Sequence, residues 1–190
     1  MMNNIVGQAI LATLNMGSEG QGWLEGIYKK ISSEGGTGSY LPMNPEEVAE
    51  IIRNASWEVE TVKGGDRPSA IAVTKGINGF YNMRSLEELD DSEMLAVEKY
   101  HGDKPQLGWV SDEFLGTPTD ELRAICGTDQ DGNGTFLITV YPGPVVNPED
   151  IEVSEEYLGK VITVAEAKRL GAKFCKVVTT KAVEEAKERR

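Results

Sequence analysis

The feature that most constrains the fold is residues 135–148, TFLITVYPGPVVNP, where a strong strand pattern meets an abrupt stop signal. Two sets of residues alternate there: Phe136, Ile138 and Val140 in one, and Leu137, Thr139 and Tyr141 in the other. One face is therefore fully apolar, which predicts a central or near-central strand. The following PGP, residues 142–144, removes two backbone donors and permits a positive φ at the glycine, so strand pairing must stop near Tyr141.

Thr139 and Tyr141 are predicted to share one face at the end of this strand. Binding and catalytic groups are often placed at such an end, so both residues are candidate site residues. The simpler interpretation is a buried strand whose two hydroxyls bond to neighbouring backbone, because Thr and Tyr are ordinary strand residues.

Composition favours a globular protein with an acidic surface. The 190 residues are 39% apolar and 26% charged, and the net charge is −12. This charge disfavours nucleic acid, because binding to a phosphate backbone depends on Lys and Arg displacing counterions. A basic protein is the easier partner, although a high net charge also serves solubility alone.

Neither metal nor cofactor is expected from the residue patterns. Cys126 and Cys175 both fall in predicted strands and have no metal-ligand spacing, which favours free thiols in a reducing compartment. The apolar run over residues 5–14 is about half a membrane span and follows no basic segment. We therefore expect a cytoplasmic protein with no membrane partner.

Residues 1–40 differ from the remainder because they hold eight of the 21 glycines. Apolar spacing predicts short helices over residues 5–14 and 23–31, but interior glycines weaken them. GGTGS at 35–39 is typical of a flexible linker. This glycine-rich helical extension is a candidate arm for homo-oligomerisation or partner binding, or else a loosely docked extension.

The rest of the chain predicts one α+β domain over residues 41–180, followed by a charged, solvated tail helix over 181–190. Its sheet should be curved and mainly antiparallel, with two or three packed helices, because strands outnumber helices and connections are short. Helices are expected at 44–55 and 163–170, and strands at 57–62, 70–73, 79–83, 94–100, 107–111, 120–126, 135–141 and 173–179.

The loop at residues 128–134, TDQDGNG, lies between two predicted strands and indicates a hairpin turn. Asp129, Asp131 and Asn133 also match the first half of an EF-hand loop. The twelfth position of that motif is Val140 rather than Glu, so the calcium pattern is incomplete.

His101 is the single histidine, and the only side chain whose ordinary pKa lies near neutrality. Any neutral-pH acid/base mechanism that needs an imidazole therefore depends on it. It stands in HGDKP, residues 101–105, a predicted turn, where a surface histidine without a catalytic role is the ordinary alternative.

The strand ending at residues 138–144, ITVYPGP, resembles the last core strand of the barnase, EndoU, colicin and RelE-like ribonuclease toxins. That resemblance implies metal-free RNA cleavage, in which Thr139 and Tyr141 bind the scissile phosphate while a 2′-hydroxyl attacks it. His101 would then act as base or acid. More generally, PEEVAEIIRNA, the YPGP strand and TVAEAKRLG together resemble small uncharacterised proteins of bacteria and their phages, which implies no activity.

Three classes of function remain open from the sequence. The first is a non-enzymatic binding or inhibitor protein whose acidic surface meets a basic partner. The second is a metal-free ribonuclease that uses His101, Thr139 and Tyr141. The third is a small-molecule pocket near Tyr141 and Trp109, for which the sequence offers only aromatic residues.

Overall fold

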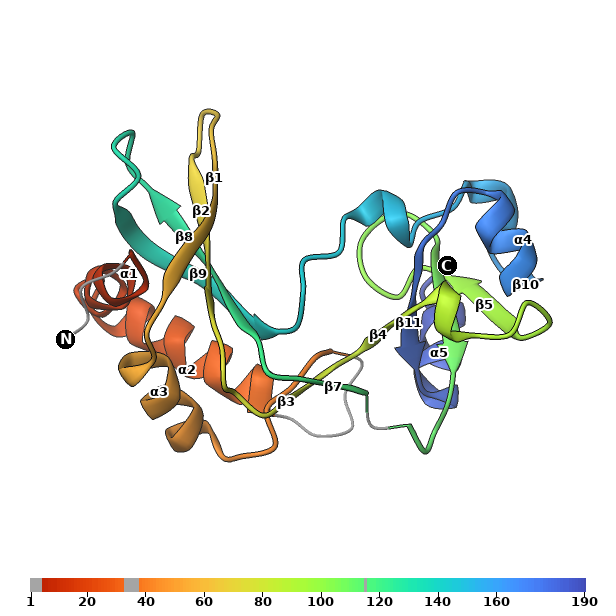
Figure 1. Cartoon of the computed structure of the whole chain (residues 1–190), viewed down its shortest axis with the longest axis horizontal. Helices are drawn as coiled ribbons and strands as arrows, with labels where there is room; N and C mark the ends of the chain where they lie inside the picture. Colours follow the sequence, from red (N-terminus) through yellow and green to blue (C-terminus); the bar gives the residue numbers. More distant parts are fainter. Residues whose placement is uncertain (1–4, 33–37, 115) are drawn as a thin grey trace. The chain divides into compact units, whose positions relative to one another are not determined.

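The computed structural model describes residues 5–32, 38–114 and 116–190 (Figure 1). Helices and mainly antiparallel sheets confirm the α+β class. The tertiary contacts of the chain fall into two compact units. The sequence had predicted one domain over 41–180. Unit 1 comprises Met1–Tyr81 with Pro118–Pro144, and unit 2 comprises Asn82–Thr117 with Val145–Arg190.

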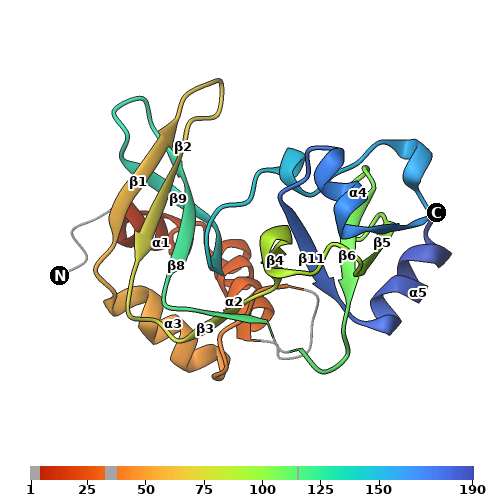
Figure 2. The same cartoon turned by 45° about the vertical axis from the view of Figure 1, so that its right-hand side comes forward.

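Unit 1 packs three helices on one four-stranded antiparallel sheet in the order β1-β2-β8-β9 (Figures 1 and 2). Its elements are α1 (Ile5–Leu14), α2 (Ser18–Ser32), α3 (Pro45–Asn54), β1 (Glu58–Lys63), β2 (Ser69–Thr74), β8 (Leu122–Thr128) and β9 (Gly134–Pro142). Two short strands, β3 (Gly79–Tyr81) and β7 (Thr117–Thr119), form a separate two-stranded sheet.

α3 begins as the sequence predicted. The Asn44 side chain accepts from the Glu47 backbone at 2.9 Å, and the Glu47 carboxylate accepts from the Asn44 backbone at 3.2 Å, which completes a capping box. Pro45 occupies the first helical position, where a missing N–H removes no hydrogen bond. Val48 and Ile52 are fully buried one turn apart and anchor the helix in the core of unit 1.

β9 is an edge strand, so the prediction of a central position was wrong. The register shifts where Ile125 faces Thr139 and Cys126 faces Leu137, which leaves Ile138 in a bulge. One extra residue reverses the alternation beyond it, because side chains in a strand point to alternate faces. Leu137 is therefore buried while Phe136, which was expected on the apolar face, is 44% exposed.

The free edge of β9 is covered by the N-terminal helices. The Thr13 hydroxyl accepts from the Leu137 backbone N–H at 2.9 Å and donates to the Ala9 carbonyl at 2.7 Å. The Trp23 indole donates to the Leu137 carbonyl at 3.0 Å. A Cβ added at Gly134 would lie 2.1 Å from the Ile5 carbonyl oxygen, so α1 approaches the strand as closely as glycine allows.

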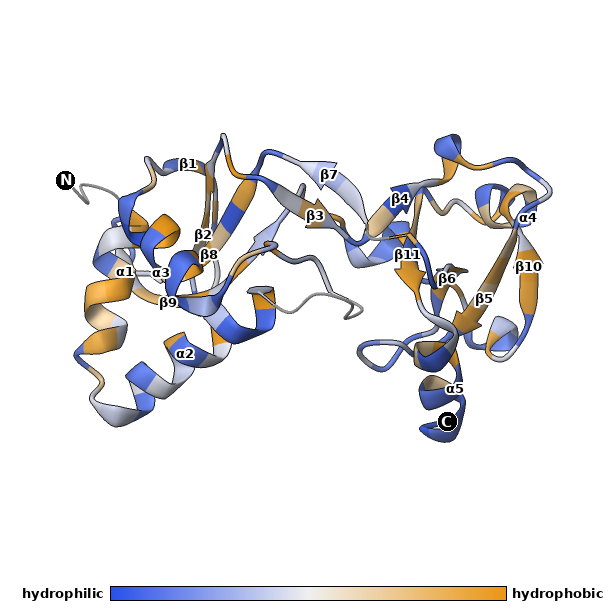
Figure 3. Cartoon of the chain, turned by 90° about the horizontal axis from the view of Figure 1, so that it is seen from below, coloured by the Kyte–Doolittle hydropathy of each residue, from blue (hydrophilic) through white to orange (hydrophobic). Residues whose placement is uncertain are grey.

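The two described helices of the first forty residues, α1 and α2, thus belong to the core of unit 1 rather than to a loosely docked extension. Figure 3 shows α2 alternating between hydrophilic and hydrophobic segments along its length. Its buried positions include Leu24 and Ile31, which join the same apolar cluster as α1 and the sheet. Most of the predicted linker at 35–39 lies outside the described residues.

Unit 2 contains a five-stranded mixed sheet in the order β10-β5-β6-β11-β4. Its strands are β4 (Met83–Ser85), β5 (Met94–Glu98), β6 (Gln106–Val110), β10 (Val161–Thr163) and β11 (Phe174–Val178), and its helices are α4 (Val164–Arg169) and α5 (Thr180–Glu188). Three 3₁₀ turns are Leu86–Glu88, Pro148–Asp150 and Glu155–Tyr157. β6 and β11 run parallel, whereas the other pairs are antiparallel.

The tail helix predicted over 181–190 is present as α5, but one of its faces is buried rather than solvated. Ala182, Val183 and Ala186 recur on one face and are buried, because even small apolar residues form a stripe at this spacing. Arg190 then pairs with Glu98, a carboxylate whose residue is only 2% exposed, through a 3.0 Å bond from Nε and a second, short contact. This pair compensates a buried charge on β5.

Both cysteines are free and buried, Cys126 in unit 1 and Cys175 in unit 2. Burial raises the pKa of each thiol to about 12. Within the described ranges, no helix combines the length and the apolar character needed to cross a membrane.

Replacing Thr13 with Val should destabilise unit 1 by about 1–3 kcal/mol, because the buried Leu137 N–H loses its acceptor while the side-chain shape is kept. Urea unfolding and hydrogen exchange of the Leu137 amide measure the effect. Thr61→Val on exposed β1 is the matched control and should change little. Equal exchange of Leu137 in both variants would contradict the role given to Thr13.

Candidate functional site

Thr139 and Tyr141 lie on the sheet surface opposite the buried side of unit 1. In the β8–β9 register, Tyr141 faces Arg123 and Thr139 faces Ile125, whereas the intervening Val140 faces Ala124 in the core. Directly opposed residues share a face, so Arg123 stands beside Tyr141. We call Glu60, Glu121, Arg123, Thr139 and Tyr141 the sheet face.

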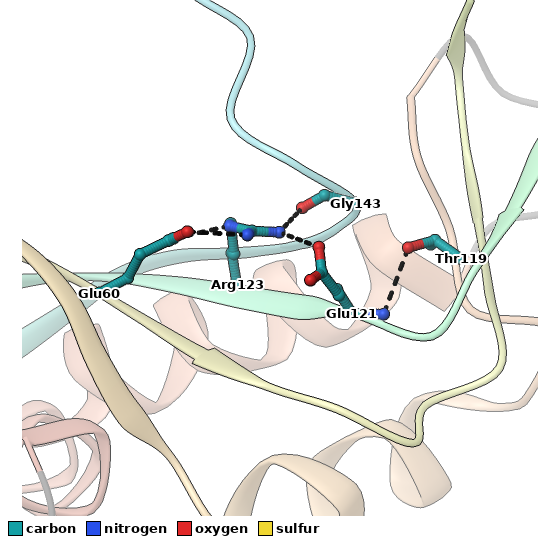
Figure 4. Close-up of polar contacts among 5 residues, drawn as sticks. All are labelled: Glu60, Thr119, Glu121, Arg123 and Gly143. Atoms are coloured by element: carbon teal, nitrogen blue, oxygen red, sulfur yellow. Dashed lines mark hydrogen bonds and ion pairs between the residues drawn. The ribbon is translucent and has the colours of Figure 1, made fainter.

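The Arg123 guanidinium is the centre of the sheet face (Figure 4). Nε and Nη2 donate to the two Glu60 carboxylate oxygens at 2.8 and 2.9 Å, a side-on bidentate pair. Nη1 donates to Glu121 at 2.8 Å and to the Gly143 carbonyl at 2.6 Å. The Glu121 backbone N–H in turn donates to the Thr119 hydroxyl at 3.2 Å.

These four bonds occupy four of the five N–H groups that a guanidinium carries. The Arg123 side chain is only 7% exposed, whereas the carboxylates of Glu60 and Glu121 remain partly open to solvent. One cation therefore sits beneath two anions, and the contacting groups carry a net charge of −1. The exposed part of this arrangement is carboxylate.

Arg123 controls the protonation of its neighbours. Its hydrogen bond to Glu60 holds the pKa of that carboxyl below the ordinary value of 4.5, against a smaller opposing effect of burial. The two glutamates raise the pKa of Arg123 itself. Burial raises the pKa of Tyr141, and the nearby Arg123 charge offsets part of that rise. At neutral pH the sheet face thus holds an ionised Glu60 and a protonated Tyr141.

Tyr81 borders the sheet face on the side of Gly143. Gly143 has a φ of 101°, the positive value predicted for the PGP segment, and a Cβ there would lie 2.4 Å from the Tyr81 ring. Tyr81 is 8% exposed, and its hydroxyl has no hydrogen-bond partner among the described residues. Burial, followed by the proximity of Tyr141, raises its pKa, so Tyr81 also stays protonated.

His101 is not part of this arrangement within unit 1. It belongs to unit 2, where it lies exposed in the connection between β5 and β6, and its backbone N–H donates to the Gln106 side chain at 3.2 Å. Neither unit by itself assembles His101 with Thr139 and Tyr141. Within unit 1 the fold brings together the two β9 residues of the predicted trio, Thr139 and Tyr141.

Trp109, the other residue of the predicted pocket near Tyr141, also belongs to unit 2. Its ring packs edge-on against Phe114 at a centroid distance of 5.4 Å, and the Arg84 guanidinium lies 4.7 Å from the ring centroid. The Trp109 ring is therefore engaged by an aromatic and a cation of its own unit.

The loop between β8 and β9 is the hairpin turn that the sequence favoured. Asp129 Oδ1 accepts from the backbone N–H groups of Asp131 and Asn133, both at 3.0 Å, and Gly132 has a φ of 82°. These contacts orient one carboxylate inward to close the turn. Among the described residues, no group of three or more His, Cys, Asp or Glu side chains is arranged to hold a metal ion.

A second concave surface lies in unit 2 and has an acidic rim. It has a volume of about 590 Å³, and its lining includes four glutamates, Glu149, Glu152, Glu155 and Glu156. Lys104 reaches Glu152 at 4.0 Å, and Lys99 reaches Glu155 at 3.3 Å. This acidic groove is open and partly neutralised by surface lysines, so its charge is weakly concentrated.

Sequence reasoning missed Glu60, Glu121 and Arg123. One signal was present: Arg123 is the only charged residue in LRAIC, residues 122–126 of the strand predicted over 120–126, and a cation among apolar residues must find partners when the sheet is packed. The identity of those partners depends on the β1–β2–β8–β9 order, because Glu60 and Arg123 are 63 residues apart.

Comparison with protein-family models, with curated proteins and with solved structures gives no match to this chain. The functional argument therefore depends on the geometry of the site itself.

The Glu60–Arg123 pair should make the stability of unit 1 depend on acid pH. Because the folded pKa of Glu60 is below its unfolded value, its contribution is present above the ordinary pKa of 4.5 and is lost as pH falls through the folded value. Urea unfolding of the wild type and of Glu60→Gln, followed by NMR signals from β8, should differ above pH 4.5 and converge in stronger acid. A difference that stays constant with pH would contradict this assignment.

Proposed function

We propose that this chain is a non-enzymatic binding protein that receives a cationic group of a basic partner on the sheet face. The observation that carries the proposal is that Glu60, Glu121 and the Gly143 carbonyl occupy four of the five N–H groups of Arg123. A phosphate would find one guanidinium N–H and two repelling carboxylates there. An arginine or lysine side chain would find acceptors already held in place.

Charge supports the same choice of partner. The chain carries 31 acidic and 19 basic residues, so the long-range field attracts a basic protein and repels nucleic acid. The carboxylates of Glu60 and Glu121 are oriented by Arg123 before any partner arrives, which lowers the entropic cost of binding. Electrostatic complementarity of this kind favours rapid association and selects partners by sign.

Tyr141 supplies the apolar part of the surface. It is partly exposed and faces Arg123 across the β8–β9 pair, and tyrosine is enriched in protein interfaces because a rigid ring buries area at low entropic cost. The ring also offers a π face to an incoming guanidinium. Thr139, two residues earlier in β9 and on the same face, adds a hydroxyl that can both donate and accept hydrogen bonds.

A tetra-arginine peptide should bind the sheet face, with NMR shifts in β1, β8 and β9 and an affinity that falls with added salt. Tyr141→Ala and Glu121→Gln should each weaken binding about fivefold, equivalent to about 1 kcal/mol. A tetra-glutamate peptide should not bind.

Glu149→Gln in the acidic groove of unit 2 is the matched control, because it removes the same charge elsewhere. It should leave the affinity unchanged. If Glu149→Gln weakens binding while Glu121→Gln does not, the cationic site lies in unit 2 and the proposal for the sheet face fails.

The alternative function is metal-free ribonuclease chemistry, favoured by one observation. An ionised Glu60 and a protonated Tyr141 stand on one face with opposite proton-transfer roles, as a base and an acid require. Arg123 would stabilise the developing phosphorane charge only if Glu60 released part of the guanidinium.

Incubation of the wild-type protein with an RNA oligonucleotide and a chelator separates the two functions. We expect no cleavage beyond that of a Thr139→Val, Tyr141→Phe double variant, because the partly exposed carboxylates of Glu60 and Glu121 repel the phosphate. Cleavage that disappears in this double variant would establish the enzyme instead, and His101→Ala would then show whether the imidazole takes part.

A further inference from the structure

The free edge of β1 is left uncovered, unlike that of β9, the other edge strand of the unit 1 sheet. Among the described residues β1 pairs only with β2, whereas α1 and α2 cover β9. All six residues of β1 are exposed, and the β1–β2 hairpin extends beyond the helices (Figures 1 and 2). We propose that β1 pairs antiparallel with β1 of a second copy of this chain, which gives a weak two-fold dimer with one continuous sheet.

Two valines of β1 form an apolar pair at this edge. The register with β2 shifts after Val59, which leaves Glu60 in a bulge. Val59 and Val62 therefore lie on the same face, opposite Ala72 and Ala70 of the buried core. They are nevertheless 51% and 53% exposed. The packing of unit 1 thus leaves two apolar side chains together at the free edge, where a second copy can cover them.

The polar residues of β1 lie on the opposite face, which carries Arg123. The register with β2 and β8 places Glu58 on that face, and the Glu60 carboxylate reaches the Arg123 guanidinium there. Thr61 and Lys63 follow on the same face. Glu58 and Lys63 are exposed, and neither forms an ion pair among the described residues. Two charges of opposite sign therefore mark the two ends of the strand.

One antiparallel register of β1 with itself matches these features. When the two-fold axis passes through the middle of the strand, Glu58 of one copy lies opposite Lys63 of the other. Val59 then lies opposite Val62, and the symmetry repeats both pairs. In each pair the two residues share a face, and opposed apolar or oppositely charged side chains stabilise an antiparallel pair. The four valines of the dimer would form one cluster.

Other registers lose this match. A shift of one residue places Val59 opposite Lys63, or Glu60 opposite Glu60 of the second copy. A shift of two residues places a valine opposite a polar residue of the other face, and larger shifts pair three residues or fewer. In the central register Glu60 lies opposite Thr61, whose hydroxyl can donate to a carboxylate. The strand therefore specifies its own partner register.

Charge favours a second copy over an arbitrary strand. Charged side chains on an edge strand discourage pairing with most chains. β1 carries its acid and its base at mirrored positions, so two-fold pairing satisfies both. Two strands of six residues form a small interface, and each copy has a net charge of −12, so we expect weak association. Salt at about 0.15 M screens the repulsion between distant charges of the two copies.

Sedimentation equilibrium of the full chain in about 0.15 M salt tests the proposal. Between about 10 μM and about 1 mM protein, it should show a monomer–dimer equilibrium with a Kd on the order of 100 μM. NMR signals of the β1 amides should shift over the same range of concentration. A chain that stays monomeric throughout this range would overturn the proposal.

Charge exchange locates the contact. Glu58→Lys and Lys63→Glu should each weaken association about tenfold, because the symmetry turns two attractive pairs into two repulsive ones. An equimolar mixture of these two variants should associate about as tightly as the wild type, because one chain then carries only lysines at the two positions and the other only glutamates. Glu25→Lys, the same charge change at an exposed position of α2, should leave association unchanged.

Two results would contradict the β1 contact. If the mixture associates no better than either variant alone, Glu58 and Lys63 do not lie opposite each other in the dimer. If the wild type and both variants associate equally, the copies meet elsewhere, such as at the N-terminal helices. All three substituted positions are exposed, so NMR spectra of the variants should remain those of the folded chain.

Discussion

The architecture of unit 1 depends on how the backbone N–H and C=O groups of Leu137, a residue of the edge strand β9, are hydrogen-bonded. An edge strand leaves N–H and C=O groups unpaired, and proteins cover or interrupt such edges to prevent pairing with other chains. At Leu137 the two groups are taken by the Thr13 hydroxyl and the Trp23 indole. The N-terminal helices therefore close the sheet where a fifth strand would otherwise add. The bulge at Ile138 turns Leu137 inward at the same point.

A second constraint is the single guanidinium on the other face of that sheet. Arg123 is held by acceptors from three separate places in the chain: β1, the residue before β8, and the turn after β9. Each contributes a bond that depends on the strand order, so the network fixes the relative positions of the strand ends. The same bonds leave partly exposed carboxylates oriented outward, which links the stability of the sheet to the charge it presents.

Local signals predicted much of the secondary structure. The helix starting at Asn44, the positive φ at Gly143 and the hairpin over 128–134 all followed from short-range chemistry, and all are confirmed. The edge position of β9 did not follow from its sequence, because the strand order depends on pairing between distant segments. The bulge at Ile138, which shifts the alternation, also became visible only in the register with β8. The burial of α5 was missed because a stripe of Ala and Val is weak in sequence and becomes decisive only against β5.

The residues of the candidate site were likewise predicted only in part from the sequence. Thr139 and Tyr141 were identified from the strand and its stop signal, and they share a face with Arg123. Their carboxylate neighbours required the tertiary fold, since Glu60 lies on a strand that reaches Arg123 only through the sheet order. His101 was chosen by chemistry alone, and the fold assigns it to the other unit.

The division of each unit between two segments has a consequence for synthesis of the chain. The helices, β1 and β2 leave the ribosome first, but β8 and β9 follow only after residues 82–117 have been made. During this interval two of the four strands of the sheet in unit 1 have not yet been made, so the apolar faces of the three helices cannot be fully covered. Unit 2 in turn begins with strands whose partners β10 and β11 come near the end. Neither unit completes its sheet before the other has begun, so the two fold as interleaved rather than successive events during translation.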